Sequence, residues 1–450
     1  MFNKPQNIHF VGIGGSGMSG IAEVLINLGH RVSGSDLKKS ETTDRLKSLG
    51  AKIFIGHNKK NIKNASVIVT STAVHKDNPE VKEALKRKIP AIRRIEMLAE
   101  LARLKYTIAV AGSHGKTTAT SLVSLVLSEG GLDPTIIIGG RLKNLDTGAK
   151  LGQGQYLVAE ADESDGSFLK LSPVITIVTN IDNDHLDYYK TMDNLKNAFV
   201  EHINSVPFYG AAIICADDKV VSEIIPKIAR KYITYGLNQN ADLQARNIKI
   251  SNNRNLFDAF YLGKKLGRIV LKVPGRHNVL NSLAAVAVGI MLGIPFKKTA
   301  QALYSFDGVG RRLEVKGSKN GILIIDDYGH HPSEIKAVLK AVKDFWGKRR
   351  LIVLFQPHRY TRTQLLFKDF GKSFENADIV RILDIYPAGE KPIKNISSSL
   401  ILKETLKNKT DASKYEGAKD FLKILRAGDI VLTLGAGDIW KEGEKLLTLI

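Results

Sequence analysis

The stretch that most constrains this chain is VAGSHGKTT, residues 110–118, which places two glycines, a lysine and two threonines directly after an apolar run. Residues 106–111 are apolar and partly β-branched, which predicts a buried strand, and residues 119–127 have the composition of a buried helix. The loop therefore stands at a predicted helix N-terminus, where unpaired N–H groups and the helix dipole favour phosphate oxygens. The pattern predicts a nucleotide-binding loop, with Lys116 on the phosphates and the Thr117 hydroxyl on Mg²⁺.

This loop departs from the usual phosphate-binding pattern at its start. The usual loop has four residues between its two glycines, but Val110 stands where the first glycine belongs, so the working unit is the shorter GSHGKT at 112–117. The simpler alternative is a plain corner between a strand and a helix. Such a corner has no need of Lys116, and a nucleotide site is therefore the better interpretation.

Length and composition indicate a soluble enzyme of several domains. A chain of 450 residues is too long for one hydrophobic core and predicts about three domains. No apolar run approaches the roughly 20 residues of a membrane span, and residues 1–10 do not resemble a signal peptide. The single cysteine, Cys215, fits a buried core thiol in a reducing compartment. We therefore expect a cytoplasmic protein with no membrane partner.

The net charge of +21 makes nucleic-acid binding the main rival function. Lysine and arginine are spread along the chain, however, and no basic stripe interleaved with aromatic residues is present. We interpret the charge mainly as a solvated surface and expect no nucleic-acid partner.

The first segment of the chain has the pattern of a dinucleotide-type fold. A strand is expected at residues 8–11, followed by GIGGSG at 12–17 and a helix at 18–28. A second strand, at 31–35, ends at Asp36, which is close to the spacing at which an acidic residue meets a ribose. This domain is expected to end near residue 104.

The glycine loop alone does not select one ligand. Any diphosphate-bearing molecule can use it, including UDP-sugars as well as nicotinamide cofactors. A nicotinamide-dependent dehydrogenase would leave Lys116 and the last third of the chain without a role.

The second segment, residues 105–310, places polar clusters at the ends of predicted strands. Strands are expected at 135–138, 156–159, 174–178 and 211–215. The clusters EADESD (160–165) and NIDNDHLD (180–187) follow two of them, at the sheet edge where ligands bind in open α/β sheets. Glu160 and His185, beside Thr117, are expected to coordinate magnesium. Asp182 or Asp184 alone is better explained as a helix N-cap.

The third segment, residues 311–450, repeats the alternation of strand and helix. Strands are expected at 322–325, 351–355, 379–383 and 430–434. The loops DDYGHHP (326–332) and QPHRYTR (356–362) follow the first two. Zinc binding by His330, His331 and His358 is disfavoured because they lack an established ligand spacing, whereas arginines in such loops suit carboxylate or phosphate recognition.

The expected fold class is therefore α/β with three domains. We predict a Rossmann-like domain at 1–104, a central P-loop ATPase-like parallel-sheet domain at 105–310 and a Rossmann-like domain at 311–450.

These motifs, in this order, resemble the Mur ligase family, which builds the peptide of bacterial cell-wall precursors. The resemblance covers nearly the whole chain, and its motifs are GIGGSGMSG (12–20), GSHGKTT (112–118), EADESD (160–165), NIDNDHLD (180–187), GRHNVLN (275–281), GRR (310–312), DDYGHH (326–331) and HRYTR (358–362). The glycine loop with Met18 is most similar to the members that add alanine.

The resemblance implies an ATP-dependent ligase of peptidoglycan precursor synthesis. It would join L-alanine to the lactyl carboxylate of UDP-N-acetylmuramate through an acyl phosphate, with ATP and Mg²⁺, as a monomer or homodimer. A murein-peptide-recycling ligase of the same superfamily is the nearest alternative. A basic, nucleic-acid-stimulated ATPase is the alternative from another class.

The resemblance also assigns roles to individual residues. Those implied in catalysis are Lys116, Glu160, His185, Arg312, His330 and Arg359. Those implied in ATP binding are Gly112, Ser113, His114, Gly115, Lys116, Thr117, Thr118, Asn278, Asn281, Arg312 and Asp327. Those implied in UDP-sugar binding are Gly12, Gly14, Gly15, Ser16, Gly17, Met18, Asp36, Ser71 and Thr72. The amino acid would meet Tyr328, His330, Arg359 and Arg362, and the metal ligands would be Thr117, Glu160 and His185.

The chain departs from the family pattern at two places. The usual Glu-Pro-Asp-His run is DNDH at 182–185 in this chain. It keeps the histidine, which is the predicted metal ligand, but changes how that histidine would approach the metal. Other members carry a modified lysine that helps to hold a second magnesium, whereas the matching place here, around Phe199, is apolar. The alanine-adding members also tend to lack that lysine.

Overall fold

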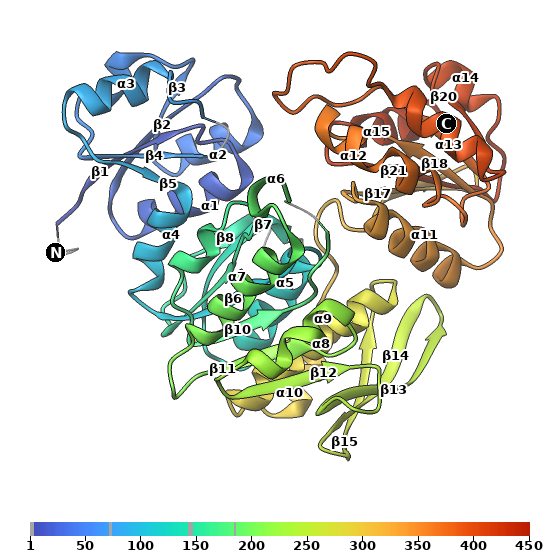
Figure 1. Ribbon diagram of the computed structural model, residues 1–450, viewed down its shortest axis with the longest axis horizontal. Helices are drawn as coiled ribbons and strands as arrows, with labels where there is room; N and C mark the ends of the chain where they lie inside the picture. The colour runs from blue at the N-terminus through green and yellow to red at the C-terminus, as the bar shows by residue number, and fades with distance from the viewer. Residues whose placement is uncertain (1–3, 72–73, 143–146, 184–185) are drawn as a thin grey trace. The chain divides into compact units, whose positions relative to one another are not determined.

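The computed structural model describes residues 4–71, 74–142, 147–183 and 186–450 as an α/β chain with three sheets (Figure 1). The chain divides into two compact units. The first comprises Met1–Arg246, Asp258–Ile269 and Leu280–Ser305, and the second comprises Asn247–Phe257, Val270–Val279 and Phe306–Ile450. The α/β class with parallel sheets, predicted from the alternation of strand and helix, is confirmed.

The first sheet has the order β3-β2-β1-β4-β5, with all neighbours parallel. Its strands are β1 (Asn7–Val11), β2 (Arg31–Asp36), β3 (Lys52–Ile55), β4 (Val67–Thr70) and β5 (Ala91–Arg93). The segments between them form α1 (Ser16–Asn27), α2 (Glu41–Ser48), η1 (Lys59–Ile62) and α3 (Pro79–Lys86), and α4 (Arg94–Ala102) follows β5. Phe10 packs in one core with Ile21 of α1, while its neighbour Val11 packs in another with Val81 of α3. Both faces of the sheet are therefore buried, as expected of a Rossmann-like domain.

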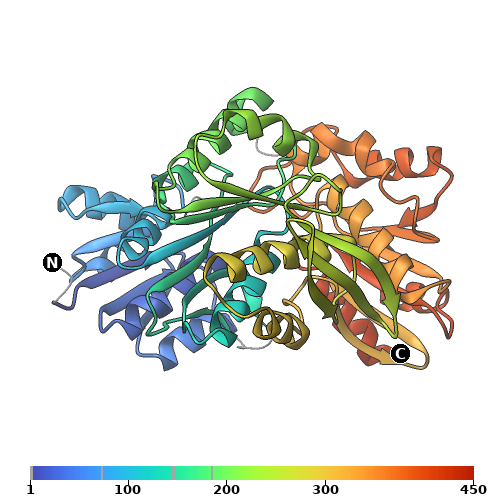
Figure 2. The same ribbon diagram turned by 90° about the horizontal axis from the view of Figure 1, so that it is seen from below.

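The second sheet has the order β15-β14-β13-β12-β11-β10-β6-β9-β7-β8 (Figures 1 and 2). Its strands are β6 (Tyr106–Ala111), β7 (Thr135–Leu142), β8 (Thr147–Lys150), β9 (Tyr156–Glu160), β10 (Ile175–Val178), β11 (Ala211–Cys215), β12 (Tyr232–Gly236), β13 (Leu243–Ser251), β14 (Arg254–Tyr261) and β15 (Lys264–Leu271). Its helices are α5 (Lys116–Glu129), α6 (Leu186–Tyr189), α7 (Met192–Asn204), α8 (Lys219–Ile224), α9 (Arg276–Met291) and α10 (Phe296–Ser305), with the short η2 (Ser167–Lys170) and η3 (Ile225–Lys227).

Strand β6 lies between β9 and β10 and is parallel to both. The carboxyl ends of these three strands therefore meet at one edge of the sheet. The loops that follow them are residues 112–115, 161–166 and 179–183, the same segments in which polar motifs were found.

The third sheet has the order β16-β17-β21-β18-β19-β20, with β16 antiparallel to β17 and the other pairs parallel. Its strands are β16 (Glu314–Lys319), β17 (Ile322–Asp327), β18 (Leu351–Phe355), β19 (Ile379–Ile382), β20 (Asp411–Lys414) and β21 (Ile430–Leu434). Its helices are α11 (Pro332–Trp346), α12 (Tyr360–Gly371), α13 (Ser398–Lys407), α14 (Ala418–Leu422) and α15 (Trp440–Leu449). Ile325 packs in one core with Leu339 of α11, and its neighbour Ile324 packs in another with Leu446 of α15. Alternate residues of one strand thus serve opposite faces.

Cys215 is buried in β11, and burial raises the pKa of its thiol to about 11, as expected of a core cysteine rather than a nucleophile. Across the described residues, no helix is long and apolar enough to cross a membrane.

A histidine of α7 that is buried against the second sheet makes the stability of the fold dependent on pH. His202 of α7 is fully buried, its Nε2 lies 2.8 Å from the Thr176 hydroxyl, and its ring stacks on Phe168. Burial lowers the pKa of His202 to about 4. The unfolded chain binds this proton near pH 6.5, so stability falls as the pH drops from about 6.5 towards 4 and then levels off.

We expect His202→Gln to flatten this acid dependence. The wild type should lose about 2 kcal/mol between pH 7 and pH 5 through this one group, a loss that the glutamine variant cannot have. Melting temperatures of both proteins at pH 7 and pH 5 check this. An equal shift in both proteins would show that His202 does not titrate in this range.

Candidate active site

The loop after β6 is shaped by two glycines in the left-handed region. Gly112 has φ +132° and Gly115 has φ +83°. A Cβ at Gly112 would lie 2.1 Å from the Thr179 hydroxyl oxygen, so a side chain has no room there. Gly115 is the N-cap of α5, which leaves the N–H groups of the first turn of α5 available to an anion. The predicted strand, loop and helix are therefore present.

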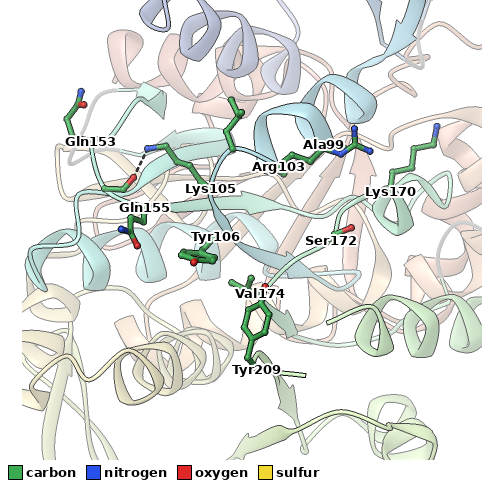
Figure 3. Close-up of a pocket in the computed structure, with 13 residues that line it drawn as sticks. Ala99, Arg103, Lys105, Tyr106, Gln153, Gln155, Lys170, Ser172, Val174 and Tyr209 are labelled. Atoms are coloured by element: carbon green, nitrogen blue, oxygen red, sulfur yellow. Dashed lines mark hydrogen bonds between the residues drawn. The ribbon is translucent and has the colours of Figure 1, made fainter. Parts of the chain in front are cut away.

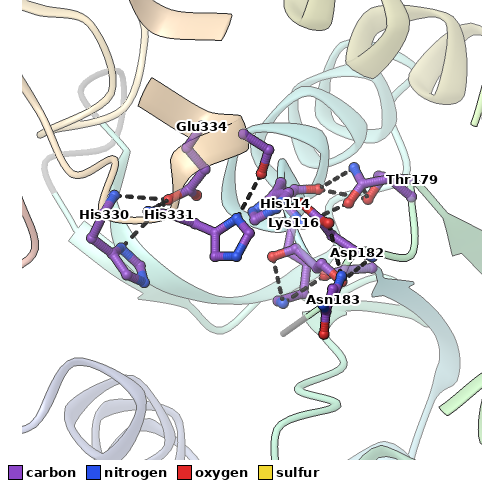
Figure 4. Close-up of polar contacts among 12 residues, drawn as sticks. His114, Lys116, Thr179, Asp182, Asn183, His330, His331 and Glu334 are labelled. Carbon is purple, nitrogen blue, oxygen red and sulfur yellow. Dashed lines mark hydrogen bonds and ion pairs between the residues drawn. The ribbon is translucent and has the colours of Figure 1, made fainter. Parts of the chain in front are cut away.

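The residues after β10 hold this loop in place. The backbone N–H of His114 donates to Asn180 Oδ1 at 2.8 Å, and the Asn180 side chain returns a bond to the His114 carbonyl at 2.9 Å. The Thr179 hydroxyl donates to the same carbonyl, and Asp182 Oδ2 lies 2.9 Å from His114 Nε2 (Figure 4). Asp182 was expected to act as a helix N-cap, but its side chain contacts His114 and the Asn183 N–H instead.

Lys116 makes a buried ion pair with Glu163. Its Nζ lies 2.9 and 2.8 Å from the two carboxylate oxygens and also donates to the Gly112 carbonyl at 2.6 Å. The Lys116 side chain is 17% exposed and that of Glu163 is 1% exposed. Burial opposes the charge on the ammonium, but Glu163 and then Asp162 outweigh it, and the pKa of Lys116 is raised. Lys116 is therefore a fixed, permanently charged donor beside the loop.

Glu163 is a site residue that the sequence analysis missed. It lies in the same motif as Glu160, and only Glu160 was assigned a role there. The Glu163 backbone carbonyl accepts a bond from the Tyr189 hydroxyl at 2.6 Å, which fixes the run that carries its side chain. The nearest signal in the sequence was the presence of four acidic residues in EADESD, but their order does not reveal which one faces Lys116.

Glu160 is the last residue of β9, and the two threonines of the phosphate loop lie in the first turn of α5. Glu160 Oε1 accepts a bond from the Gly139 N–H at 2.8 Å, and its charge acts on Lys116. Thr117 and Thr118 are buried in the first turn of α5. His185 and Asp184 lie outside the described residues. The structure therefore brings Glu160 and Lys116 together and leaves the predicted His185 ligand untested.

The two asparagines of α9 are both buried. Asn281 lies against the phosphate loop, because a Cβ at Gly115 would be 2.8 Å from its Oδ1. Asn278 donates to the Pro274 carbonyl at 2.7 Å.

The glycine loop of the first sheet is braced by the end of β2. Gly12 has φ +82°, and its N–H donates to the Ser35 carbonyl at 2.8 Å. The N–H of Gly14 donates to Asp36 Oδ2 at 2.8 Å. A Cβ at Gly12 would lie 3.6 Å from the Ser71 hydroxyl oxygen, so Ser71 also borders the loop.

Met18 and Thr72 were also predicted to contact the ligand of this loop. The Met18 side chain is 1% exposed and packs in the hydrophobic core, so it supports the loop from within rather than facing a ligand. Thr72 lies outside the described residues. Gly15 is the N-cap of α1, and Ser16 and Gly17 begin that helix.

In the second unit, the loop after β17 is organised by Asp327. Its side chain is 3% exposed and accepts backbone N–H groups of Leu313 and Gly329, each at 2.7 Å. Burial raises the pKa of Asp327 to about 6. Two guanidinium groups lie over the Tyr328 ring, that of Arg311 at 4.9 Å and that of Arg312 at 5.2 Å from the ring centroid. Arg311 has φ +61° and is tied to Asp326, so it holds this arrangement in place.

The half-buried imidazole of His358 in the same unit is influenced by several positively charged neighbours. Burial lowers the pKa of His358 to about 3, assisted by His330, Arg362 and Arg359. The His330 and His358 rings are 5.7 Å apart, and the His330 N–H donates to Glu334 at 2.9 Å (Figure 4). The cluster is positive and suits a carboxylate. His358 and Glu334 had been assigned no catalytic or binding role from the sequence.

A pocket of about 680 Å³ lies elsewhere, at the amino ends of β6 and β10 (Figure 3). It is lined by Arg103, Lys105, Tyr106, Val174 and Tyr209, among others. None of the predicted site residues that the structure describes lines it.

We expect Lys116→Met to destabilise the protein by about 3 kcal/mol, because it leaves the buried Glu163 carboxylate without its partner. The double variant Lys116→Met/Glu163→Gln should recover most of that loss, since no buried charge remains. Chemical unfolding of the wild type, Lys116→Met, Glu163→Gln and the double variant checks both statements. Lys196→Met, which breaks a surface pair with Glu223, is the matched control and should change little. Equal losses in the single and double variants would contradict a coupled pair.

Three family models match consecutive parts of the chain: "Mur ligase family, catalytic domain" at residues 7–106, "Mur ligase middle domain" at 110–289 and "Mur ligase, glutamate ligase domain" at 311–437. The chain is 66% identical to a UDP-N-acetylmuramate--L-alanine ligase of Endomicrobium trichonymphae, with 100% of each chain covered. It is 54% identical to the ligase of the same name from Geobacter sulfurreducens, covering 99% of this chain and 98% of that one.

Solved structures give the same result. The crystal structure of the UDP-N-acetylmuramate-alanine ligase of Thermotoga maritima matches with a TM-score of 0.85 and 30% identity, covering 98% of each chain. A murein peptide ligase of Psychrobacter arcticus matches with a TM-score of 0.74 and 25% identity, also covering 98% of each chain. The three matched models and the full-length relatives agree with the motifs and the sheets, and this chain belongs to the Mur ligase family.

Proposed function

We propose that this chain is an ATP-dependent ligase that joins L-alanine to UDP-N-acetylmuramate in peptidoglycan precursor synthesis. The observation that carries the proposal is the 66% identity, over the full length of both chains, to a relative with that name. The buried Lys116 at a glycine loop before α5 supports it, because a ligase of this kind needs a site for ATP phosphates.

The reaction follows from the chemistry of the three substrates. An oxygen of the lactyl carboxylate attacks the γ-phosphorus of ATP, which gives an acyl phosphate and releases ADP. The alanine amine then attacks the acyl carbon, and phosphate leaves from the tetrahedral intermediate as the amide forms. The protein has to neutralise charge during both steps, which fixed cations and N–H groups do best.

Lys116 and the first turn of α5 are proposed to hold the ATP phosphates, together with the rest of the loop at 112–118. Because Lys116 is paired with Glu163, the phosphates must compete with that carboxylate for the ammonium. Arg312 is proposed to meet the γ-phosphate, Asn278 and Asn281 to meet the nucleotide, and Asp327 to meet its ribose. The Asp327 carboxylate already accepts two backbone N–H groups, so it can bind the ribose only through its remaining lone pairs.

Magnesium is proposed as the ion that accompanies ATP. Thr117 and Glu160 supply oxygen donors of the kind it prefers, and His185 remains a predicted third ligand. Within the described part of the chain, the Thr117 hydroxyl makes no hydrogen bond. Glu160 accepts one hydrogen bond through Oε1 and none through Oε2. These free oxygens fit such an ion. When bound, it would neutralise charge on the phosphates.

The UDP-sugar is assigned to the loop at 12–17, with Asp36 and Ser71 beside it and Thr72 still a prediction. The amino acid is assigned to Tyr328, His330, Arg359 and Arg362, where the cations around His358 suit the alanine carboxylate. We keep the domain division 1–104, 105–310 and 311–450 for these three tasks. A cytoplasmic location, a monomer or homodimer, and the absence of nucleic-acid and membrane partners complete the proposal.

Phosphate release from ATP with magnesium tests this function. We expect release only when UDP-N-acetylmuramate and L-alanine are both present, and we expect Lys116→Ala to lower the rate by about 100-fold or more. Lys196→Ala, at the surface, is the matched lysine control and should retain the wild-type rate. Release with a muropeptide tripeptide in place of L-alanine would assign the chain to murein-peptide recycling. Release without the UDP-sugar would exclude a ligase of this family.

A further inference from the structure

The start of α4 is docked on the acidic run after β9 by ion pairs. Arg94 donates to Asp162 Oδ2 at 3.0 Å, and Arg93 lies 3.9 Å from Asp165. Glu96 of the same helix is paired with Lys170. These contacts join the first and second sheets within one compact unit.

Arg94 also lies against the glycine loop. A Cβ at Gly17 would be only 2.5 Å from an Arg94 terminal nitrogen and 3.1 Å from its Cδ and Cζ. Gly17 is the second residue of α1, so the guanidinium packs on the first turn of that helix. A cation has the wrong sign for a helix N-terminus, whose dipole and free N–H groups attract anions. Asp162 offsets this cost in part, and an anion on the loop would offset it further.

Asp162 interacts with two cations, Arg94 at the start of α4 and Lys116 at the start of α5. Its carboxylate is attracted by Lys116 and by Arg94, and these charges keep its pKa low against the effect of burial. The next residue, Glu163, holds the Lys116 ammonium with both of its oxygens. A change in the charge balance at Asp162 therefore acts directly on the lysine of the phosphate loop.

We propose that Arg94 is a positioning residue that couples the two loops: it neutralises Asp162 beside Lys116, and it presents positive charge to a diphosphate on the glycine loop. The inference rests on the proposed function, which supplies the two ligands. It assigns Arg94 two separable effects, a direct one on the diphosphate and one on the nucleotide that passes through Asp162.

Loss of Arg94 should therefore weaken both ligands for different reasons. The diphosphate loses a nearby cation at the α1 N-terminus. The nucleotide meets an Asp162 carboxylate that is no longer neutralised, which repels its phosphates and competes for Lys116. Removing the Asp162 charge as well should restore only the affinity for the nucleotide.

Calorimetric titration with ADP and with UDP-N-acetylmuramate tests the coupling. We expect Arg94→Met to weaken both ligands by about tenfold, within the ordinary range of coupling between sites. In Arg94→Met/Asp162→Asn, ADP affinity should return to within about twofold of the wild type, while UDP-sugar affinity stays about tenfold weaker. Arg93→Met is the matched control: it removes an exposed arginine from the same docking face and should leave both affinities unchanged.

Other results would overturn the inference. The proposed effect through Asp162 would be wrong if Arg94→Met left the ADP affinity unchanged. It would also be wrong if the double variant bound ADP as weakly as Arg94→Met. If Arg94→Met does not fold, Asp162→Asn alone decides, because it should bind ADP more tightly than the wild type, and equal affinity would contradict the coupling. A wild type that binds ADP but not UDP-N-acetylmuramate would refute the proposed function instead, and the ADP titrations would still test the link through Asp162.

Discussion

The parallel alignment of β9, β6 and β10 is the constraint on which the candidate active site depends. It brings three loops to one edge of the sheet, and each supplies a different component. The loop after β6 supplies the α5 N-terminus, the run after β9 supplies the carboxylates, and the residues after β10 lock the backbone of the phosphate loop through Thr179 and Asn180. The strands themselves are almost entirely buried, so their register cannot shift without exposing core residues.

A buried ion pair stands at the centre of this edge. Burying a charge is costly unless a partner is present, and Lys116 and Glu163 each meet that need for the other. The same pairing keeps the lysine charged and fixed, which suits a residue that has to meet phosphate oxygens. Under the proposed function, ATP would replace one set of negative oxygens around Lys116 with another, and the net gain would depend on the carboxylates that remain nearby. On the same proposal, Asp162 and the Arg94 that donates to it would affect nucleotide affinity.

Many elements could be predicted from local pattern, and the exceptions have physical causes. Residues 211–215 and 351–355 are strands with the predicted bounds, because an apolar run buried on both faces is distinctive. Strands β13 to β16 were not predicted, since β13, β15 and β16 keep many exposed residues and lack a continuous apolar signal. Met18 was assigned to the UDP-sugar from the resemblance, yet its side chain belongs to the core. Gly112 and Gly115, the two glycines of the predicted phosphate loop, both have positive φ, a conformation that favours glycine.

Local sequence was enough to predict the two glycine loops, because each depends on backbone preferences and helix-start chemistry within a few residues. The order of the motifs was likewise enough to indicate the family. The sequence could not show that Glu163 rather than Glu160 holds Lys116, across 47 residues of chain, or that Arg94 meets Asp162 across 68, and the folded chain shows both. Such pairs depend on strand register and on the path of each loop, and a neighbouring carboxylate of the same type gives the sequence no means of choosing between them.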